Sequence, residues 1–241
     1  MALVELNVPY YVPNGVGFVE VFDSMGTDLT VANAARVSFG KRKLVMDSKD
    51  ERLIEFLGQS EPAHTAPFRH AYISLHVKAP EFIARQWYKS IVGCEYEFDL
   101  GRSFKDTPWS EISGRYIAMN EFWLPDYLRL AAANKKQGSI DNTHERSEEF
   151  VSRMAQLTDQ ANALYKEMYD AGVAPEQARA ILPMSYYTEF IWTASLQAVL
   201  HFVKLRDHPE AQKEIREYAE IVHTIVQELF PVATEKFKDK A

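Results

Sequence analysis

The sequence predicts an α+β fold, in which a small antiparallel or mixed sheet packs against long helices. Short stretches alternate apolar and polar residues, as half-buried strands do, and longer stretches repeat apolar residues every three or four positions, as amphipathic helices do. The 241 residues, of which 46% are hydrophobic, suffice for one sizeable core. We therefore expect a single catalytic domain over residues 1–241.

The first third of the chain carries a strand pattern followed by two helix patterns. Alternation predicts a strand from Phe18 to Phe22, and a short helix is expected from Leu29 to Val37. A capping box, Ser48-x-x-Glu51, predicts the start of a helix that runs to about Leu57. Residues 58–67 are then expected to form a loop.

The next segment joins a strand to a helix that carries two basic side chains. A strand is expected from His70 to Val77, and the proline that follows is well placed in the first turn of a helix. On that helix Ile83 and Trp87 share one side, and Arg85 and Lys89 share another. We therefore expect two cations on one helical face.

The rest of the chain is predicted to be mostly helical. Residues 92–110, with Gly93, Gly101 and Pro108 among charges and aromatics, predict an inserted loop within the domain. The last helix has one apolar stripe, which must be buried in the core or at a subunit interface. The expected elements after residue 140 are a helix from Asp141 to Asp170, a short helix from Pro175 through Arg179 that stops at Pro183, a strand from Tyr186 to Trp192, a helix from Ala194 to Leu205 and a helix from about Glu210 to Phe230.

The composition excludes several classes of protein. A net charge of −7 argues against a nonspecific nucleic-acid binder, which gains affinity from a basic surface. The single cysteine, Cys94, excludes an internal disulfide and suits a reducing cytoplasm. The chain has no signal-peptide pattern, and it lacks a run of about 18 apolar residues. We expect a cytoplasmic protein without a nucleic-acid or membrane partner.

Two short segments combine the residue types that bind a flat, anionic ligand such as a nucleotide. They are Arg85-Gln86-Trp87-Tyr88-Lys89 and, after the insertion, Ser110-Glu111-Ile112-Ser113-Gly114-Arg115-Tyr116. Arginine offers a planar fork to phosphate, glutamine offers a donor and an acceptor to a base edge, and tryptophan or tyrosine offers a stacking face. No glycine-rich phosphate loop is present, so side chains and helix ends must hold any phosphate.

The histidines, the cysteine and two of the arginines can each be explained by function or by structure alone. His64, His70 and His76 recur every six residues, but His70 and His76 fall on the expected strand, where core or surface placement is commoner than metal binding. No metal site is therefore predicted, and His64, in a loop, is the better functional candidate. Cys94 has no base nearby that would make it a nucleophile. Arg179 and Arg206 each end a helical segment, where a cation complements the helix dipole without any ligand.

Taken together, these motifs resemble the flavin-dependent thymidylate synthases over about residues 18–225. The resemblance rests on their order along the chain, which makes it far more specific than any one motif. The motifs are Ala35-Arg36-Val37-Ser38-Phe39, the segment from His64 to His70, His76-Val77-Lys78-Ala79-Pro80, Ala84-Arg85-Gln86-Trp87, Glu111-Ile112-Ser113-Gly114-Arg115-Tyr116, Ala178-Arg179-Ala180-Ile181-Leu182-Pro183 and Leu205-Arg206.

The resemblance implies a homotetramer that binds FAD and dUMP where subunits meet. It also implies methylenetetrahydrofolate as carbon donor, NADPH as reductant and dTMP as product. The implied catalytic residues are Arg206, which would face N3 of the uracil, and Ser113. A guanidinium there would stabilise the negative charge that builds on the ring when C5 becomes nucleophilic.

The same resemblance implies two sets of binding residues. The nucleotide would be held by Gln86, Trp87, Tyr88, Lys89, Glu111, Ile112, Ser113, Gly114, Arg115, Arg179 and Arg206. FAD would contact Ser38, His64, Ala66, Lys89, Ser90, Ile91, Glu111, Ser195, Leu196, Gln197 and His201.

The chain departs from the family at its best-known signature, Arg-His-Arg followed by seven residues and a serine. Here Lys89-Ser90-Ile91 takes the place of the triplet, and a longer insertion precedes Ser113. Two cation-capable groups are therefore missing beside an anionic cofactor. Candidates to compensate are Lys41, Arg42, Lys43, Arg102 and Lys105.

Two alternatives to a thymidylate synthase stay open. A related flavin enzyme would modify another pyrimidine deoxynucleotide, although Arg206 favours uracil because a cation suits an ionising N3–H. A catalytically silent homologue would bind the nucleotide alone, and the missing triplet motivates that reading. The joint presence of Gln86, Glu111 and Arg206 argues against it, since a silent scaffold has no need of them.

Overall fold

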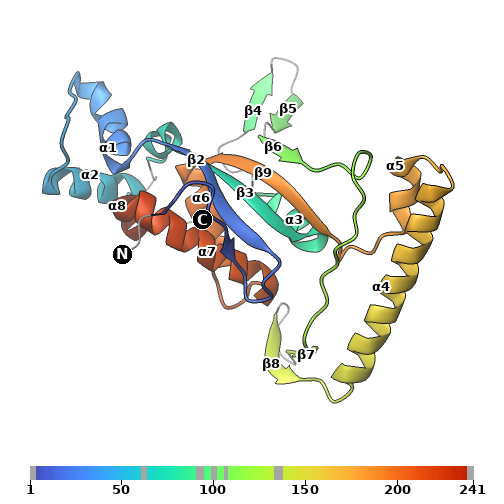
Figure 1. Ribbon diagram of the computed structural model, residues 1–241. Helices are drawn as coiled ribbons and strands as arrows, with labels where there is room; N and C mark the ends of the chain where they lie inside the picture. The colour runs from blue at the N-terminus through green and yellow to red at the C-terminus, as the bar shows by residue number, and fades with distance from the viewer. Residues whose placement is uncertain are drawn as a thin grey trace.

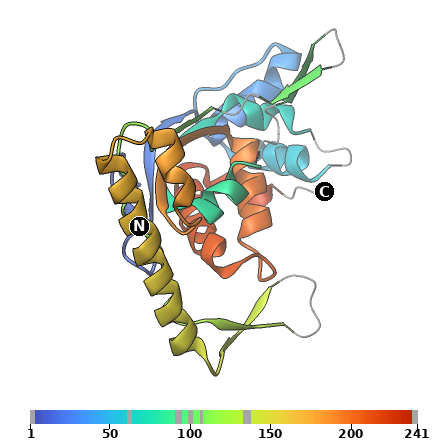
Figure 2. The same cartoon turned by 90° about the vertical axis from the view of Figure 1, so that its right-hand side faces the viewer.

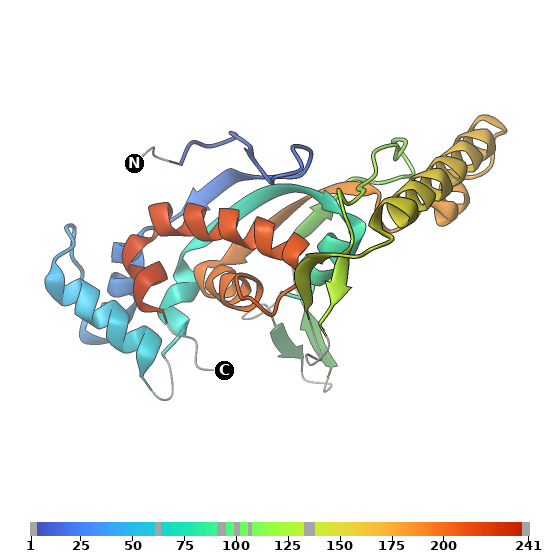
Figure 3. The ribbon, with the colours of Figure 1, turned by 90° about the horizontal axis from the view of Figure 1, so that it is seen from below.

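A computed structural model describes residues 4–60, 64–90, 95–98, 102–105, 108–132 and 138–237. It confirms the α+β class: a five-stranded antiparallel sheet is covered on one face by helices from the C-terminal part of the chain (Figures 1 and 3). The strand order is β1 (Tyr10–Tyr11), β2 (Phe18–Met25), β3 (Tyr72–Pro80), β9 (Tyr187–Ser195) and β6 (Trp109–Glu111).

The centre of the sheet is the pairing of β3 with β9, which keeps register from Tyr72 opposite Ser195 to Pro80 opposite Tyr187. Alternate residues of β3 are buried, among them Ile73, Leu75 and Val77, as a half-covered strand requires. The strand begins at Tyr72 rather than at His70, because residues Ala66–His70 form a 3₁₀ turn.

The helices of the described chain lie mostly where the sequence predicts them. Their bounds are α1 (Asp28–Arg36), α2 (Ser48–Gln59), α3 (Glu81–Trp87), α4 (Ser147–Asp170), α5 (Pro175–Ala178), α6 (Leu196–Arg206), α7 (Lys213–Leu229) and α8 (Pro231–Lys236). Short 3₁₀ turns follow α1 at Val37–Phe39 and α5 at Arg179–Ile181. No helix among these is long and apolar enough to cross a membrane.

Helix α2 starts from a different cap than the one predicted. Asp47 is the N-cap, and its carboxylate accepts hydrogen bonds from the backbone N–H groups of Lys49 and Asp50. Asp50 completes the box from the third helical position, so Ser48-x-x-Glu51 was wrong by one residue. The helix also continues to Gln59, into the residues expected to form a loop.

The predicted helix from Asp141 to Asp170 is too long at its start. Residues Ser139–Thr143 form strand β8, which pairs with β7 (Arg129–Ala131), and α4 begins only at Ser147. All five residues of β8 are exposed, so the hairpin carries no buried alternation that would have revealed it. This β7–β8 hairpin lies at the lower end of α4 beside the start of α7 (Figures 1 and 2).

The inserted residues 92–110 also contain strands. Glu95–Phe98 (β4) pairs with Arg102–Lys105 (β5), and β6 then joins the main sheet against β9. Helix α7 buries Ile215, Tyr218, Val222 and Ile225, so its apolar stripe belongs to the core of this chain.

Candidate functional site

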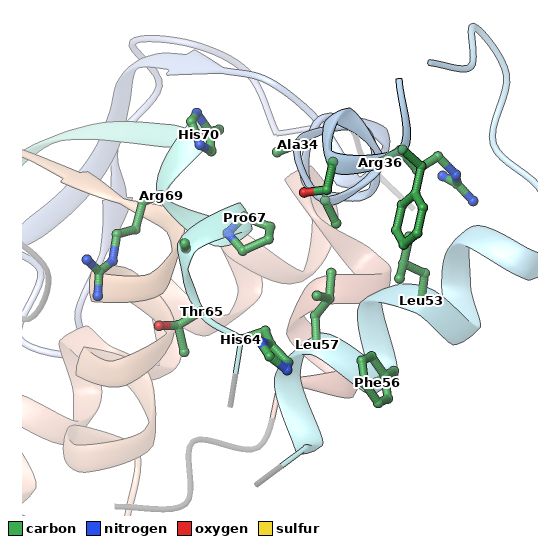
Figure 4. Close-up of a pocket in the computed structure, with 14 residues that line it drawn as sticks. Ala34, Arg36, Leu53, Phe56, Leu57, His64, Thr65, Pro67, Arg69 and His70 are labelled. Carbon is green, nitrogen blue, oxygen red and sulfur yellow. The ribbon is translucent and has the colours of Figure 1, made fainter. Parts of the chain in front are cut away.

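One cavity lies between α1, α2 and the 3₁₀ turn at Ala66–His70 (Figure 4). Its volume is about 690 Å³, within the range of small-molecule sites. Ser38, His64 and Ala66 all line it, so the structure brings together three of the residues predicted to bind a cofactor.

The walls of this cavity offer both ring and cation contacts. The imidazole of His64 stacks on Phe56 with ring centroids 5.8 Å apart. Arg36 forms an ion pair with the buried Asp50. Arg69 donates from Nε to Oε1 of Gln197 at 2.6 Å, which links the cavity to the first turn of α6. A flat ring with a negatively charged substituent fits such walls.

The other predicted cofactor residues lie on separate elements. Ser195 caps α6 by accepting from the backbone N–H of Ala198, and it is buried together with Leu196 and Gln197. His201 is half-buried on the same helix. Ser90 is buried directly after α3, and Ile91 lies outside the described residues.

A second cavity, of about 470 Å³, brings Lys89 and Glu111 together with Arg85 and Glu81. Helix α3 ends at Trp87, so Arg85 and Lys89 do not share a helical face, but they do share this cavity. Burial, and then the nearby charge of Glu111, raises the pKa of Glu81.

Glu111 is fixed in this cavity by two donors. It accepts from Trp109 Nε1 at 3.0 Å and from Thr188 Oγ1 at 2.5 Å. Burial of Tyr186 is the main cause that raises its pKa to about 12, and the negative charge of Glu81 is the second. The phenol group of Tyr186 therefore stays protonated.

A third cavity, of about 400 Å³, brings together Gln86 from α3 and Arg206 from the end of α6. Arg206 donates from Nη2 to the carbonyl oxygen of Gln86 at 3.3 Å, and its buried Nε has no hydrogen-bond partner among the described residues. Burial lowers the pKa of Arg206, but an arginine keeps its proton even so. The cavity therefore holds a fixed positive charge.

A fourth group lies apart from that cavity. Gly114 lets its backbone approach Arg179: a Cβ at this position would meet Cδ of Arg179 at 3.3 Å. Arg115 donates from Nε to Oγ of Ser113 at 3.4 Å. Neither Arg115 nor Arg179 lines the cavity that holds Gln86 and Arg206. One chain thus presents the predicted nucleotide residues in three groups: Gln86 with Arg206, Lys89 with Glu111, and Ser113 with Arg115 beside Gly114 and Arg179.

The side chain of Trp87 is not a stacking face for a base. It is fully buried and stacks on Phe202 at 4.3 Å between ring centroids, in the core between sheet and helices. Of the tryptophan and the tyrosine expected to offer a stacking face, Trp87 does not, and a contact of Trp87 with the nucleotide by other atoms stays a prediction. Tyr88 is 54% exposed and offers the aromatic face instead.

The candidate compensating cations are placed differently from one another. Lys43 is bound by Asp47 at 2.7 Å and by Asp50 at 3.1 Å. Lys41 and Arg42 line a cavity of about 490 Å³ that shares Ala34 and His70 with the first one. The side chains of Arg102 and Lys105 lie outside the described part of the chain.

The three histidines do not converge. His76 lies on the sheet, between Glu20 at 2.6 Å and Glu189 at 3.3 Å, whereas His64 and His70 line the first cavity. His70 ends the 3₁₀ turn and is not on the strand. Within the described ranges, no three histidine, cysteine, aspartate or glutamate side chains gather as metal ligands do.

Several residues of these cavities carry no signal in the sequence. Arg129, Ser139 and Gln212 line the cavity of Arg206 because the β7–β8 hairpin and the start of α7 meet there in space. Arg69 also lines a cavity, but the sequence does hold a signal for it. It lies inside the motif from His64 to His70, and treating every residue of that motif as functional would have identified it.

The fold is a sheet covered by helices, and its cavities offer cations and, in the first, an aromatic wall, as sites for flat, anionic ligands do. The model of the family described as thymidylate synthase complementing protein matches residues 20–232. The flavin-dependent thymidylate synthase of Thermus thermophilus is 38% identical over 224 residues, 92% of this chain and 76% of that protein. That of Thermosipho africanus is 35% identical, covering 92% of this chain and 90% of the relative.

Solved structures agree with this. The UMP/dUMP methylase PolB of Streptomyces cacaoi with 5-Br dUMP aligns at a TM-score of 0.76 with 29% identity, covering 92% of this chain and 94% of that one. The same methylase with 5-Br UMP gives a TM-score of 0.74. The chain belongs to the flavin-dependent thymidylate synthase family, as its motifs predict.

Proposed function

We propose that this protein is a flavin-dependent thymidylate synthase that methylates dUMP reductively to dTMP. The observation that carries the proposal is the convergence of Gln86 and Arg206 in one cavity, in a chain with this family membership. Methylenetetrahydrofolate would supply the carbon and NADPH the reducing equivalents.

FAD suits the first cavity. The stacked pair of His64 and Phe56 offers an aromatic wall, and Arg69 brings a cation to the rim. Ser38, His64 and Arg69 would hold the cofactor there. Lys41 and Arg42 in the adjoining cavity offer positive charge in place of the two cation-capable groups that the altered triplet lacks. When bound, the flavin supplies hydride transfer, which no side chain provides.

Arg206 would act on the pyrimidine through its charge. Its guanidinium is held at the end of α6 by the carbonyl group of Gln86, and burial weakens the competition from water. A positive charge fixed beforehand at N3 and O4 stabilises the anion that makes C5 nucleophilic. Arg206 cannot give up its proton there, so the stabilisation persists through the reaction.

The nucleotide site is proposed to be composite. Gln86 and Arg206 would face the base from one chain, while Ser113, Arg115 and Arg179 would reach the nucleotide from another chain of a homotetramer. The separation of these two groups within one chain supports this arrangement. A cytoplasmic location belongs to the same proposal, because a single cysteine suits a reducing compartment.

A second candidate substrate is the ribonucleotide UMP, since PolB is a UMP/dUMP methylase. The higher identity to thymidylate synthases favours dUMP. Purified protein should be titrated with FAD while its visible spectrum is recorded. NADPH oxidation with methylenetetrahydrofolate should then be measured with dUMP, UMP or dCMP, and the nucleotide products weighed by mass spectrometry.

A flavin spectrum together with dTMP formed from dUMP is the expected result. Product from UMP at an equal or higher rate would move the assignment to the ribonucleotide. A protein that binds dUMP, takes up no flavin and forms no product would contradict the proposal and support a silent homologue.

A further inference from the structure

A continuous chain of hydrogen bonds runs along the wall of the cavity of Arg206, and Gln86, Arg129 and Gln212 line that cavity. Arg129 on β7 lies 2.8 Å from Oε1 of Glu214 through Nη1. Gln212 donates from Nε2 to Oε2 of Glu214 at 2.9 Å. Gln86 in turn donates from Nε2 to Oε1 of Gln212 at 2.7 Å. These four residues connect the β7–β8 hairpin to α3 across the start of α7.

The orientation of each amide in this chain follows from its neighbour. A carboxylate only accepts, so the NH₂ group of Gln212 must face Glu214 and its oxygen must face Gln86. The NH₂ group of Gln86 must then face Gln212, where it donates at the shorter distance, and it also donates to the carbonyl oxygen of Phe82 at 3.4 Å. The Oε1 atom of Gln86 is left over, and no described residue donates to it.

The anchor of this chain stays ionised at neutral pH. Burial alone would raise the pKa of Glu214, but the hydrogen bonds from Arg129, Gln212 and the backbone, together with the charge of Arg129, outweigh burial and lower it. Arg129 is itself held in place by donating from Nε to Oγ of Ser139 at 2.7 Å. The donor and acceptor at each step of the hydrogen-bond chain are therefore fixed, starting from Arg129.

We infer that Arg129, Glu214 and Gln212 are positioning residues that turn the amide of Gln86 so that its oxygen accepts a hydrogen bond from the nucleotide. The ligand group would be an N–H or O–H donor of a uracil nucleotide beside Arg206, and in this respect the inference rests on the proposed function. The cavity lined by Gln86, Arg206 and Gln212 is where that group would lie.

The substitution Glu214→Gln tests this because it reverses the chain without breaking it. Arginine only donates, so the new amide must turn its oxygen to Arg129 and its NH₂ group to Gln212. Gln212 then accepts there and donates to Gln86. Gln86 would present its NH₂ group to the nucleotide, where a donor would meet a donor.

The double variant Gln212→Glu with Glu214→Gln restores the direction. The amide at position 214 still accepts from Arg129 and donates to the carboxylate at position 212, which accepts from Gln86 as in the wild type. Gln86 again turns its oxygen to the cavity. Rescue by a second substitution separates positioning from a mere loss of packing.

The measurement is the dissociation constant of dUMP for each folded holoenzyme, together with its melting temperature. We expect Glu214→Gln to weaken dUMP binding by about 10- to 100-fold and the double variant to come back to within about threefold. The control Glu220→Gln removes one negative charge from an exposed position of the same helix and should bind dUMP as the wild type does.

Two results would overturn the inference. One is a Glu214→Gln variant with unchanged affinity for dUMP, and the other is a folded double variant that binds no better than that single variant. Wild-type protein that binds no dUMP would instead contradict the proposed function.

The melting temperatures of the variants test the hydrogen-bond chain in the absence of a ligand. Gln212→Glu alone sets two carboxylates against each other, so its melting temperature should fall by about 2–8 °C and recover when Glu214→Gln is added. Strictly additive shifts would rule the chain out.

Discussion

At the scale of single residues, Arg206 is the group on which the proposed chemistry depends most. Its position is set by the length of α6 and by the carbonyl group of Gln86, and its Nε atom is buried without a described partner. A buried donor without a partner costs free energy, so such an atom is one that a ligand oxygen would satisfy.

Replacing Arg206 with glutamine should lower the rate of dTMP formation by about 100- to 1,000-fold, because the charge at the pyrimidine ring is lost. Arg216→Gln is a matched control, since Arg216 on α7 is paired only weakly with Glu220 at 3.8 Å. Single-turnover rates at saturating dUMP would measure the effect. A variant that binds dUMP and turns it over at the wild-type rate would remove Arg206 from the mechanism.

At the scale of elements, α7 packs against the start of β2 through one close approach. A Cβ on Gly17 would collide with the hydroxyl group of Tyr218, whose oxygen is buried without a described partner. Tyr218→Phe should therefore leave the free energy of unfolding unchanged or raise it.

Gly17→Ala should cost about 1–3 kcal/mol in the wild type, because the added methyl group has no room. The cost should be smaller in the Tyr218→Phe background, where the hydroxyl group is absent. Urea unfolding of the two single variants and the double variant would measure this coupling. Equal costs of Gly17→Ala in both backgrounds would show that Tyr218 is not the obstacle.

Helix α8 is held by a carboxylate from the other end of the chain. Asp28 accepts from the backbone N–H groups of Val232 and Ala233, both at 2.9 Å, and it is buried. Asp28→Ala should destabilise the protein by about 2–4 kcal/mol, because two buried donors lose their acceptor. Asp159→Ala, at an exposed position of α4, is the control for urea unfolding. A loss no larger than that of the control would mean that solvent satisfies these donors.

The elements also show what the sequence predicts and what it does not. Pro80 marks the junction of β3 and α3 because it cannot continue a strand's hydrogen bonding, and the prediction there is nearly right. The cap of α2 was missed because Asp47 and Ser48 are both good caps, and only backbone geometry separates them. The β7–β8 hairpin was missed because every residue of β8 is exposed and none of β7 is fully buried, so neither strand alternates.

Some residues of the candidate site could likewise be predicted from the sequence, and others could not. Ser38, His64 and Ala66 meet in one cavity as the motifs suggest, since each lies near the end of a short element. Trp87 is buried together with Ile83, as their shared side of the predicted helix indicates, so of the tryptophan and the tyrosine that could stack on a ligand it is Tyr88 that is exposed. The hydrogen bonds from Arg129 to Glu214 and from Gln86 to Gln212 join segments far apart in sequence, so spacing alone holds no sign of them.

At the scale of the whole molecule, the predicted nucleotide residues lie in separate groups on each chain. If a nucleotide site takes Gln86 and Arg206 from one subunit and Arg115 and Arg179 from another, two inactive variants should complement each other. Arg206→Gln and Arg115→Gln should each be inactive alone. Mixed and reassembled, they should recover up to about one quarter of the wild-type activity, because some sites then receive both native residues.

Light scattering before and after mixing would measure the assembly, with four copies of the 27.7 kDa chain expected. A mixture of Arg206→Gln with Arg206→Lys is the control, since both variants damage the same half of the site. Mixed assemblies with no recovered activity would place all four side chains in a site made by one subunit.

Helix α6 connects the cavity proposed for FAD to the cavity proposed for the nucleotide. Its first turn carries Gln197, bound to Arg69 of the first cavity, and its last residue is Arg206. The helix spans about 15 Å and turns about 100° per residue. Deleting or inserting one residue within it would rotate Arg206 away from Gln86 while leaving every other motif intact. The length of this segment should thus tolerate change less well than most of its side chains do.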